Sequence, residues 1–300
     1  MKYDIIVIGA GPAGMTAAIY ARRAAKTVLL FEAASYGGQI INAHSIENYP
    51  VEPHISGFDF AARLYEQTKA LGAEFKFEKA VGIEDKGSEK LVSTPSGVYS
   101  AGAVIIATGS DKRKLGLDNE DALSGRGVSY CATCDGAFFR GKAVAVAGGS
   151  RNALEDALYL ADIVQKVYII HRSDNFRGAE AEYDKLKGRE NAEFVQGSVT
   201  KLIVDKKLTA IEVTSNDGTV SRLDIDGLFV AIGRVPENQN FSSVIELDDK
   251  GYAVAGEDCL TKTAGIFVAG DNRVKQVRQL VTAAADGAVA ASAAIRYLNG

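Results

Sequence analysis

The feature that most constrains this chain is a strand–turn–helix–strand unit that occurs twice. In the first copy, an apolar strand at residues 3–8 leads into the turn Gly9-Ala10-Gly11-Pro12-Ala13-Gly14, a helical pattern continues to about residue 23, and a second strand at 27–31 ends at Glu32. Glycines in such a turn let the backbone approach a pyrophosphate at the positive end of the helix. Glu32 can accept hydrogen bonds from ribose hydroxyls. The unit predicts dinucleotide binding.

The second copy begins 139 residues later, an offset that carries Gly9 onto Gly148 and Glu32 onto His171. It comprises a strand at 142–147, the turn Gly148-Gly149-Ser150-Arg151-Asn152-Ala153, a helix at 152–164 and a strand at 167–170. Two further apolar strands, at 104–109 and 228–233, are expected to close one sheet each. The sequence therefore predicts an α/β fold with two Rossmann-like dinucleotide-binding units.

Composition agrees with a globular protein of about two domains, since 300 residues at roughly 150 per domain give that number. Basic residues number 34 and acidic residues 38, for a net charge of −4, and no basic block indicates a nucleic-acid partner. No apolar run approaches the ~18 residues of a membrane helix, and the N-terminal segment does not resemble a signal peptide. We expect a cytoplasmic protein that binds neither nucleic acid nor membrane.

Two of the three cysteines, Cys131 and Cys134, form a C-x-x-C motif. In a reducing compartment this spacing indicates metal binding or redox chemistry. A loop that leads into a helical turn can bring the two sulfurs within disulfide range. A zinc site needs two more ligands. The remaining candidates do not stand at the short spacing of a ligand pair: His44, His54, His171 and Cys259. A reversible dithiol is favoured over zinc or an inert buried pair, and we expect no metal.

Two neighbouring residues allow more than one interpretation. Asp135 follows Cys134 directly, and it is either a turn-forming or helix-capping acid or a proton donor beside the sulfurs. Cys259 stands alone in the sequence and is expected to be a small, partly buried residue.

The order of these motifs is specific. The first glycine turn is followed by Ala107-Thr108-Gly109, by Cys131-Ala132-Thr133-Cys134-Asp135, by the second turn, and by Ala269-Gly270-Asp271 with Arg278-Gln279. Over essentially its whole length the chain resembles the low-molecular-weight thioredoxin reductases.

The resemblance implies a discontinuous FAD-binding domain at residues 1–113 and 240–300. A pyridine-nucleotide-like domain at 114–239 is inserted into it and carries the C-x-x-C dithiol. Homodimers are typical of the family. Besides Gly9, Gly11, Pro12, Ala13, Gly14 and Glu32, the residues that match FAD-binding positions are Gly37, Gly38, Gln39, Asn48, Ala107, Thr108, Gly109, Asp271, Arg278 and Gln279.

The resemblance also implies a chemistry. Electrons pass from a donor to FAD, then to the Cys131–Cys134 disulfide, and then to thioredoxin through a mixed disulfide. Cys134 faces the flavin, Cys131 attacks thioredoxin, and Asp135 helps to protonate the Cys134 thiolate. Because the nicotinamide and the dithiol share a domain, that domain is expected to rotate about linkers near 111–114 and 236–240.

The second nucleotide site departs from the family pattern. Ser150 and Arg151 stand where the family has a glycine and its neighbour, and the usual His-Arg-Arg-x-x-x-Arg is His171-Arg172-Ser173-Asp174-Asn175-Phe176-Arg177. Losing one arginine contact to a ribose 2′-phosphate costs about tenfold in affinity. Gly148, Ser150, Arg151, His171, Arg172 and Arg177 remain as the predicted nicotinamide site. NADPH stays the favoured donor.

Other interpretations remain open. NADH, reduced ferredoxin or a deazaflavin are the alternative donors for the same disulfide reduction. A non-enzymatic, flavin-containing redox sensor is the alternative of another class.

Overall fold

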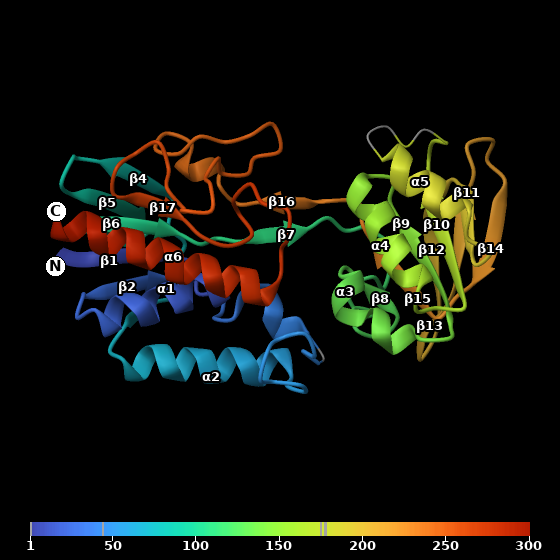
Figure 1. Cartoon of the computed structure of the whole chain (residues 1–300), viewed down its shortest axis with the longest axis horizontal. Coiled ribbons are helices and arrows are strands. Elements are labelled where there is room, and N and C mark those ends of the chain that lie inside the picture. The colour runs from blue at the N-terminus through green and yellow to red at the C-terminus, as the bar shows by residue number, and fades with distance from the viewer. Residues whose placement is uncertain (1, 44, 175, 177–178) are drawn as a thin grey trace. The chain divides into compact units, whose positions relative to one another are not determined.

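The computed structural model describes residues 2–43, 45–174, 176 and 179–300 (Figure 1). The chain forms two compact units: unit 1 comprises Met1–Asp111 and Val235–Gly300, and unit 2 comprises Lys112–Arg234. Unit 2 is therefore inserted between the two segments of unit 1. The junctions fall slightly before the predicted ones at 113/114 and 239/240. The second one does so because Asn238, fully buried, donates hydrogen bonds to carbonyl groups of unit 1.

Unit 1 is built on a seven-stranded sheet in the order β3-β2-β1-β6-β5-β4, with β17 paired to β6. The strands are β1 (Lys2–Ile8), β2 (Val28–Phe31), β3 (Glu74–Lys76), β4 (Gly82–Asp85), β5 (Lys90–Thr94), β6 (Gly97–Ile106) and β17 (Ile266–Val268). Strand β5 pairs antiparallel with both β4 and β6. The other pairings of this sheet are parallel. Side chains of β1 alternate between two cores, because successive residues of a strand point to opposite faces.

Both faces of this sheet are covered, as a largely parallel sheet requires. The helices are α1 (Pro12–Arg23), α2 (Gly57–Ala70) and α6 (Leu280–Asn299), with short 3-10 turns η1 (Gly38–Asn42) and η3 (Gln239–Phe241). Helices α1 and α6 share one core, and the alanine-rich sequence of α6 allows them to approach closely. A Cβ atom on Gly287 would lie 2.2 Å from the carbonyl oxygen of Ala13. The opposite face packs against the segment around Phe241 and Ile245.

Unit 2 repeats this plan on a smaller scale. Its parallel sheet has the order β11-β10-β9-β15-β8, and a three-stranded antiparallel sheet has the order β12-β13-β14. The parallel strands are β8 (Val128–Ser129), β9 (Ala143–Ala147), β10 (Lys166–His171), β11 (Ala192–Gln196) and β15 (Gly227–Val230). The antiparallel strands are β12 (Ser198–Asp205), β13 (Lys207–Thr214) and β14 (Val220–Asp224). The helices are α3 (Ala132–Asp135), η2 (Gly136–Phe139), α4 (Arg151–Ala161) and α5 (Glu180–Lys187).

The two segments that join the units are short strands, β7 (Ser110–Lys112) and β16 (Arg234–Pro236), which form a two-stranded sheet. Within the units, β1–α1–β2 and β9–α4–β10 are the two repeated elements, and β6 and β15 lie beside β1 and β9. The predicted α/β fold with two dinucleotide-binding units is confirmed. Two elements end earlier than predicted: α4 ends at Ala161 instead of residue 164, and β6 ends at Ile106, before Ala107-Thr108-Gly109. In the described part of the chain, every helix is too short or too polar to cross a bilayer.

Candidate active site

The first glycine turn of unit 1 has a backbone path that only glycine permits. Gly9 has a φ of +108°, and a Cβ atom there would lie 2.3 Å from the carbonyl oxygen of Ala107. A Cβ atom on Gly14 would lie 1.9 Å from the carbonyl oxygen of Gly9. The turn is therefore pressed against the end of β6, and α1 begins within it, with Pro12 at its first position.

A second glycine pair faces this turn. Gly37 donates its N–H to the carbonyl of Ala10 at 2.8 Å. A Cβ atom on Gly38 would lie 3.3 Å from the Cα atom of Gly11. Two bare glycine backbones thus meet at the start of α1, where the helix offers unpaired N–H groups. This is a cradle that an extended phosphate-bearing group can occupy and that side chains would fill.

Glu32, at the end of β2, is held beside the cradle by the backbone. Its Oε2 accepts the N–H of Ala10 at 2.8 Å, and its Oε1 accepts the N–H of Ala34 at 2.9 Å. An ionised carboxylate has about four acceptor positions, so these two bonds leave capacity for ribose hydroxyls. The geometry fits the ribose-binding role predicted for Glu32.

Residues from distant segments converge at the start of α6. Gln279 caps this helix in a reciprocal pair with Thr282, and its Oε1 accepts the Nδ2–H of Asn48 at 3.1 Å. The Arg278 guanidinium lies 4.2 Å from the centre of the Tyr252 ring. It also donates to the carbonyl of Asp271 at 3.3 Å.

The remaining predicted FAD positions are also tied to the fold of unit 1. Gln39 donates to Asp111 at 3.1 Å. Thr108 accepts the Nδ2–H of Asn272 at 3.2 Å and lies 3.4 Å from the Oδ1 of Asn238. Both asparagines are fully buried. Neither was predicted from the sequence, since no spacing pattern marks a buried amide that bridges segments.

A buried ionic cluster, also missed, supports the segment that carries Asp271. The Asp286 carboxylate accepts hydrogen bonds from Arg273 at 2.8 and 2.9 Å, from Lys275 at 2.9 Å and from the N–H of Gly270 at 2.9 Å. Burial alone raises the pKa of Asp286, but the hydrogen bonds from Arg273 and Lys275 outweigh it, and the pKa is lowered. The cluster fixes the connection from β17 to α6.

Cys259 is buried, and its Sγ lies 3.6 Å from the carbonyl oxygen of Asp286. Burial, followed by the nearby Asp286 charge, raises the pKa of the Cys259 thiol to about 12. We predict that Cys259 does not react with a thiol reagent at neutral pH until the protein unfolds, because the thiolate is the reactive form. Thiol counting should find no reactive thiol in the oxidised native protein and two after reduction. A third thiol that reacts at the rate of a free cysteine would contradict this assignment.

The redox pair lies in unit 2, where Cys131 and Cys134 form a disulfide with a Cα–Cα distance of 5.3 Å. Cys131 precedes the four-residue helix α3, and the N–H of Asp135 donates to the Cys131 carbonyl at 3.1 Å. The two cysteines and Asp135 are all half-buried. The structure therefore brings the three predicted catalytic residues together.

Ser129 completes this group and was not predicted. Its hydroxyl donates to Oδ2 of Asp135 at 2.6 Å and accepts the N–H of Cys131 at 3.1 Å. Only the residue order Ser-x-Cys could have marked it, and that spacing is not specific by itself.

The second glycine turn is also tightly packed. Gly148 has a φ of +153°, and a Cβ atom there would lie 2.5 Å from the carbonyl oxygen of Ala231. The His171 ring lies directly against Gly149, since a Cβ atom on that glycine would be 2.3 Å from the ring. Ser150 caps α4, and its Oγ accepts the N–H of Ala153 at 3.4 Å. The serine that departs from the family pattern thus stabilises the helix start.

The predicted arginines of this site differ in their surroundings. Arg151 is exposed, and its Nε lies 3.8 Å from Oε2 of Glu182. Arg172 is exposed and presents its carbonyl to Asn216 at 2.9 Å. Arg177, like His44, lies outside the described residues.

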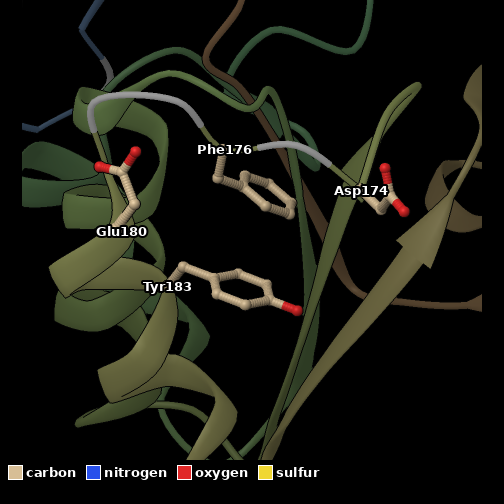
Figure 2. Close-up of a pocket in the computed structure, with 4 residues that line it drawn as sticks. All are labelled: Asp174, Phe176, Glu180 and Tyr183. Atoms are coloured by element: carbon tan, nitrogen blue, oxygen red, sulfur yellow. The ribbon is translucent and has the colours of Figure 1, made fainter.

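A pocket of about 380 Å³ is lined by residues that follow β10 and by residues of α5 (Figure 2). Its described lining consists of the stacked rings of Phe176 and Tyr183, 4.9 Å apart, flanked by the carboxylates of Asp174 and Glu180. His171 contacts Phe176 at a ring distance of 5.3 Å. The pocket therefore adjoins the strand end at which a dinucleotide ribose is expected.

A glycine turn follows the first strand of each βαβ unit, β1 and β9, and a disulfide lies beside a carboxylate. These features define a dinucleotide-dependent disulfide oxidoreductase. Residues 3–288 match the family model described as pyridine nucleotide-disulphide oxidoreductase. A thioredoxin reductase of Listeria monocytogenes is 42% identical over 99% of this chain and 94% of its own length, and one of Bacillus subtilis is 40% identical over 99% and 95%. The structure of a Streptococcus pyogenes thioredoxin reductase superposes with a TM-score of 0.95 at 36% identity, over 99% of this chain and 98% of that one.

The chain belongs to the pyridine nucleotide-disulphide oxidoreductase family. The resemblance to the thioredoxin reductases, predicted from the order of the motifs, is confirmed over the whole chain. The prediction that the chain is a disulfide-reducing enzyme is confirmed with it.

Proposed function

We propose that this enzyme passes electrons from NADPH, through FAD and the Cys131–Cys134 disulfide, to thioredoxin. The observation that carries the proposal is the disulfide beside Asp135, in a unit that also contains a dinucleotide-type turn. The relatives named above support thioredoxin as the acceptor, since they match almost the entire chain. The homodimer and the cytoplasmic location stay predictions.

FAD fits unit 1. At the cradle the bare backbones of Gly11 and Gly38 face each other beside the start of α1, where a pyrophosphate would meet helix N–H groups, and Glu32 is held next to it by the N–H of Ala10. The other proposed FAD-binding residues are Gly9, Pro12, Ala13, Gly14, Gly37, Gln39, Asn48, Ala107, Thr108, Gly109, Asp271, Arg278 and Gln279. When bound, the flavin supplies the two electrons that reduce a disulfide.

Side chains of this protein then carry out the thiol–disulfide exchange and the proton transfer. Reduction breaks the Sγ–Sγ bond, and the Cys134 sulfur takes a proton from Asp135. The Cys131 thiolate attacks the thioredoxin disulfide and forms a mixed disulfide, in which one thioredoxin sulfur leaves as a thiolate. Cys134 then gives up its proton and attacks the Cys131 sulfur; the mixed disulfide breaks, the Cys131–Cys134 disulfide is restored, and the second thioredoxin sulfur leaves and takes up the proton, which completes reduced thioredoxin.

NADPH is proposed to bind unit 2 through Gly148, Ser150, Arg151, His171, Arg172 and Arg177. Support comes from the exposed guanidinium groups of Arg151 and Arg172 near the glycine turn, since arginine binds phosphate strongly. The donor site and the disulfide both belong to unit 2, and the FAD cradle belongs to unit 1. We therefore place a hinge at the joining strands β7 and β16, which lets each in turn approach the flavin.

The test is an anaerobic donor comparison with the purified holoenzyme. We expect NADPH to bleach the flavin at least about tenfold faster than NADH at equal subsaturating concentrations, because a charge-assisted contact contributes about 1.5–3 kcal/mol. Arg172→Ala should remove most of this preference. Arg222→Ala, which removes an exposed arginine paired to Asp224, should leave it unchanged.

Stopped-flow absorbance gives the rates for NADPH, NADH and reduced ferredoxin. A flavin that stays oxidised with both nicotinamides but bleaches with ferredoxin would show that the donor assignment is wrong. Equal rates with NADPH and NADH would show that the 2′-phosphate is not recognised.

A further inference from the structure

We propose that Ser129 is a positioning residue for the disulfide-reduction step: its hydroxyl holds Asp135 in place and stabilises the carboxylate left when Asp135 gives its proton to Cys134. This inference rests on the proposed function, because it assumes that Asp135 is the proton donor. It concerns a residue that neither the motif pattern nor the order of motifs identifies.

Ser129 bridges the segment that carries the disulfide, because it bonds to residues at both of its ends. Its Oγ donates to Oδ2 of Asp135 at 2.6 Å and accepts the N–H of Cys131 at 3.1 Å. The Cys131 carbonyl lies farther from the same hydroxyl, at 3.4 Å, so the carboxylate is the principal acceptor of its single proton. One side chain thus joins the first cysteine of the motif to the acid that follows the second.

Ser129 is itself held in the parallel sheet of unit 2. Ser129 is the last residue of β8, is only 4% exposed, and pairs in parallel register with Phe229 of β15. Phe229 is itself buried in the core of unit 2. By contrast, Asp135 belongs to a helix of four residues, and so short a helix is not stable without outside contacts. Ser129 therefore joins the acid of this short helix to a buried strand.

The chemistry follows from the direction of the hydrogen bond. When the Cys131–Cys134 bond is reduced with the two electrons that a bound flavin would supply, one proton moves from the Asp135 carboxyl to the Cys134 sulfur. The carboxylate that results accepts the Ser129 hydroxyl, and a hydrogen bond to the charged form favours that form. Asp135 regains its proton from solvent before the next cycle. Ser129 thus acts on the product side of the proton transfer.

The variants are Ser129→Ala, which removes the hydroxyl, and Ser129→Thr, which keeps it on a side chain suited to a strand. We expect Ser129→Ala to reduce the rate of thioredoxin reduction about tenfold. Without the hydroxyl, the protonated form of Asp135 persists to higher pH. The alkaline limb of the rate profile should therefore move upward by about one pH unit. Ser129→Thr should restore both the rate and the profile to nearly wild type.

A double-mutant comparison shows whether Ser129 acts through Asp135. In an Asp135→Asn background, Ser129→Ala should lower the rate less than about twofold, since the acid it positions is gone. Ser221→Ala is the control, because its hydroxyl contacts only a backbone carbonyl, that of Val213, among the bonds the structure describes. The ratio of flavin to protein absorbance checks that each variant is folded and loaded. Should Ser129→Ala fail to fold, Ser129→Cys, a weaker donor, takes its place in the same comparison.

The outcomes separate the two proposals. If Asp135→Asn slows the enzyme but the Ser129 variants do not, or if Ser129→Ala costs tenfold in both backgrounds with an unchanged pH profile, the role of Ser129 is overturned while the proposed function stands. If Asp135→Asn leaves both rate and profile unchanged, the proton-donor role of Asp135 fails, and the inference fails with it.

Discussion

Replacing Cys134 by serine is expected to abolish thioredoxin reduction while FAD stays bound. The disulfide can no longer form, so the chain has no acceptor for two electrons and no second sulfur to release thioredoxin from a mixed disulfide. We expect the steady-state rate to fall at least about a thousandfold, as for loss of a nucleophile that acts as part of a unit. Thioredoxin-dependent turnover and the flavin spectrum of the purified protein measure both parts of this result.

The matched control is Cys259→Ser, which also replaces a thiol by a hydroxyl. Cys259 is buried in unit 1, in contact with the carbonyl of Asp286, and unit 2 holds the redox pair. This variant should keep thioredoxin reduction near the wild-type rate, although its stability can fall. A Cys134→Ser enzyme that retained more than a tenth of the wild-type rate would exclude the disulfide relay.

The parts of the fold that could be predicted are those with a local sequence signal. The elements β1–α1–β2 and β9–α4–β10 combine apolar strands, glycine turns and helical periodicity within about 30 residues, which is the extent of a βαβ unit. The redox loop was found for the same reason, since Cys131 and Cys134 are three positions apart. The ends of elements were less certain. The strand predicted at 104–109 extends three residues too far, because no periodicity marks where a buried strand leaves its sheet.

The parts that could not be predicted depend on contacts between distant segments. Asn272 donates to the carbonyl of Ile106, 166 residues away in sequence, and Asn48 meets Gln279 across 231 residues. The partners of Asp286 are Gly270, Arg273 and Lys275, and no spacing in the sequence marks their pairing with residue 286. These bonds appear only once the sheet and α6 are in place, because tertiary packing brings their partners together.

Ser150, which replaces a glycine of the family pattern, has a structural role as well as an effect on nucleotide binding. The sequence indicated only that a serine crowds a pyrophosphate-binding turn. In the structure the same side chain caps α4, and an N-cap serine contributes about 1 kcal/mol to helix stability. The residue therefore has a structural reason to be present whichever donor binds.

Replacing Gly9 by alanine is expected to yield a protein that is purified almost without FAD. The new Cβ atom would lie 2.3 Å from the carbonyl oxygen of Ala107 and 2.8 Å from its carbon, on a residue with a φ of +108°. Neither backbone can move freely, since the N–H of Ala107 donates to Ile8 and that of Gly9 donates to Phe31, both at 2.7 Å. The turn must therefore shift away from the cradle. We expect at least about a hundredfold weaker FAD binding, or roughly 2.7 kcal/mol.

Gly87→Ala is the control that separates the steric overlap of a Cβ atom at position 9 from the cost of a positive φ. Gly87 has a φ of +79° in the connection between β4 and β5, and a Cβ atom there would meet nothing within 4 Å. This control carries the strain of a positive φ, about 1–2 kcal/mol, without steric overlap. It should lower the melting temperature slightly and leave FAD bound. Titration of the apoproteins with FAD, followed by flavin fluorescence, measures both affinities. Equal FAD affinity in the two variants would show that the close approach of Gly9 to β6 does not shape the cradle, and the placement of FAD at this turn would have to be abandoned.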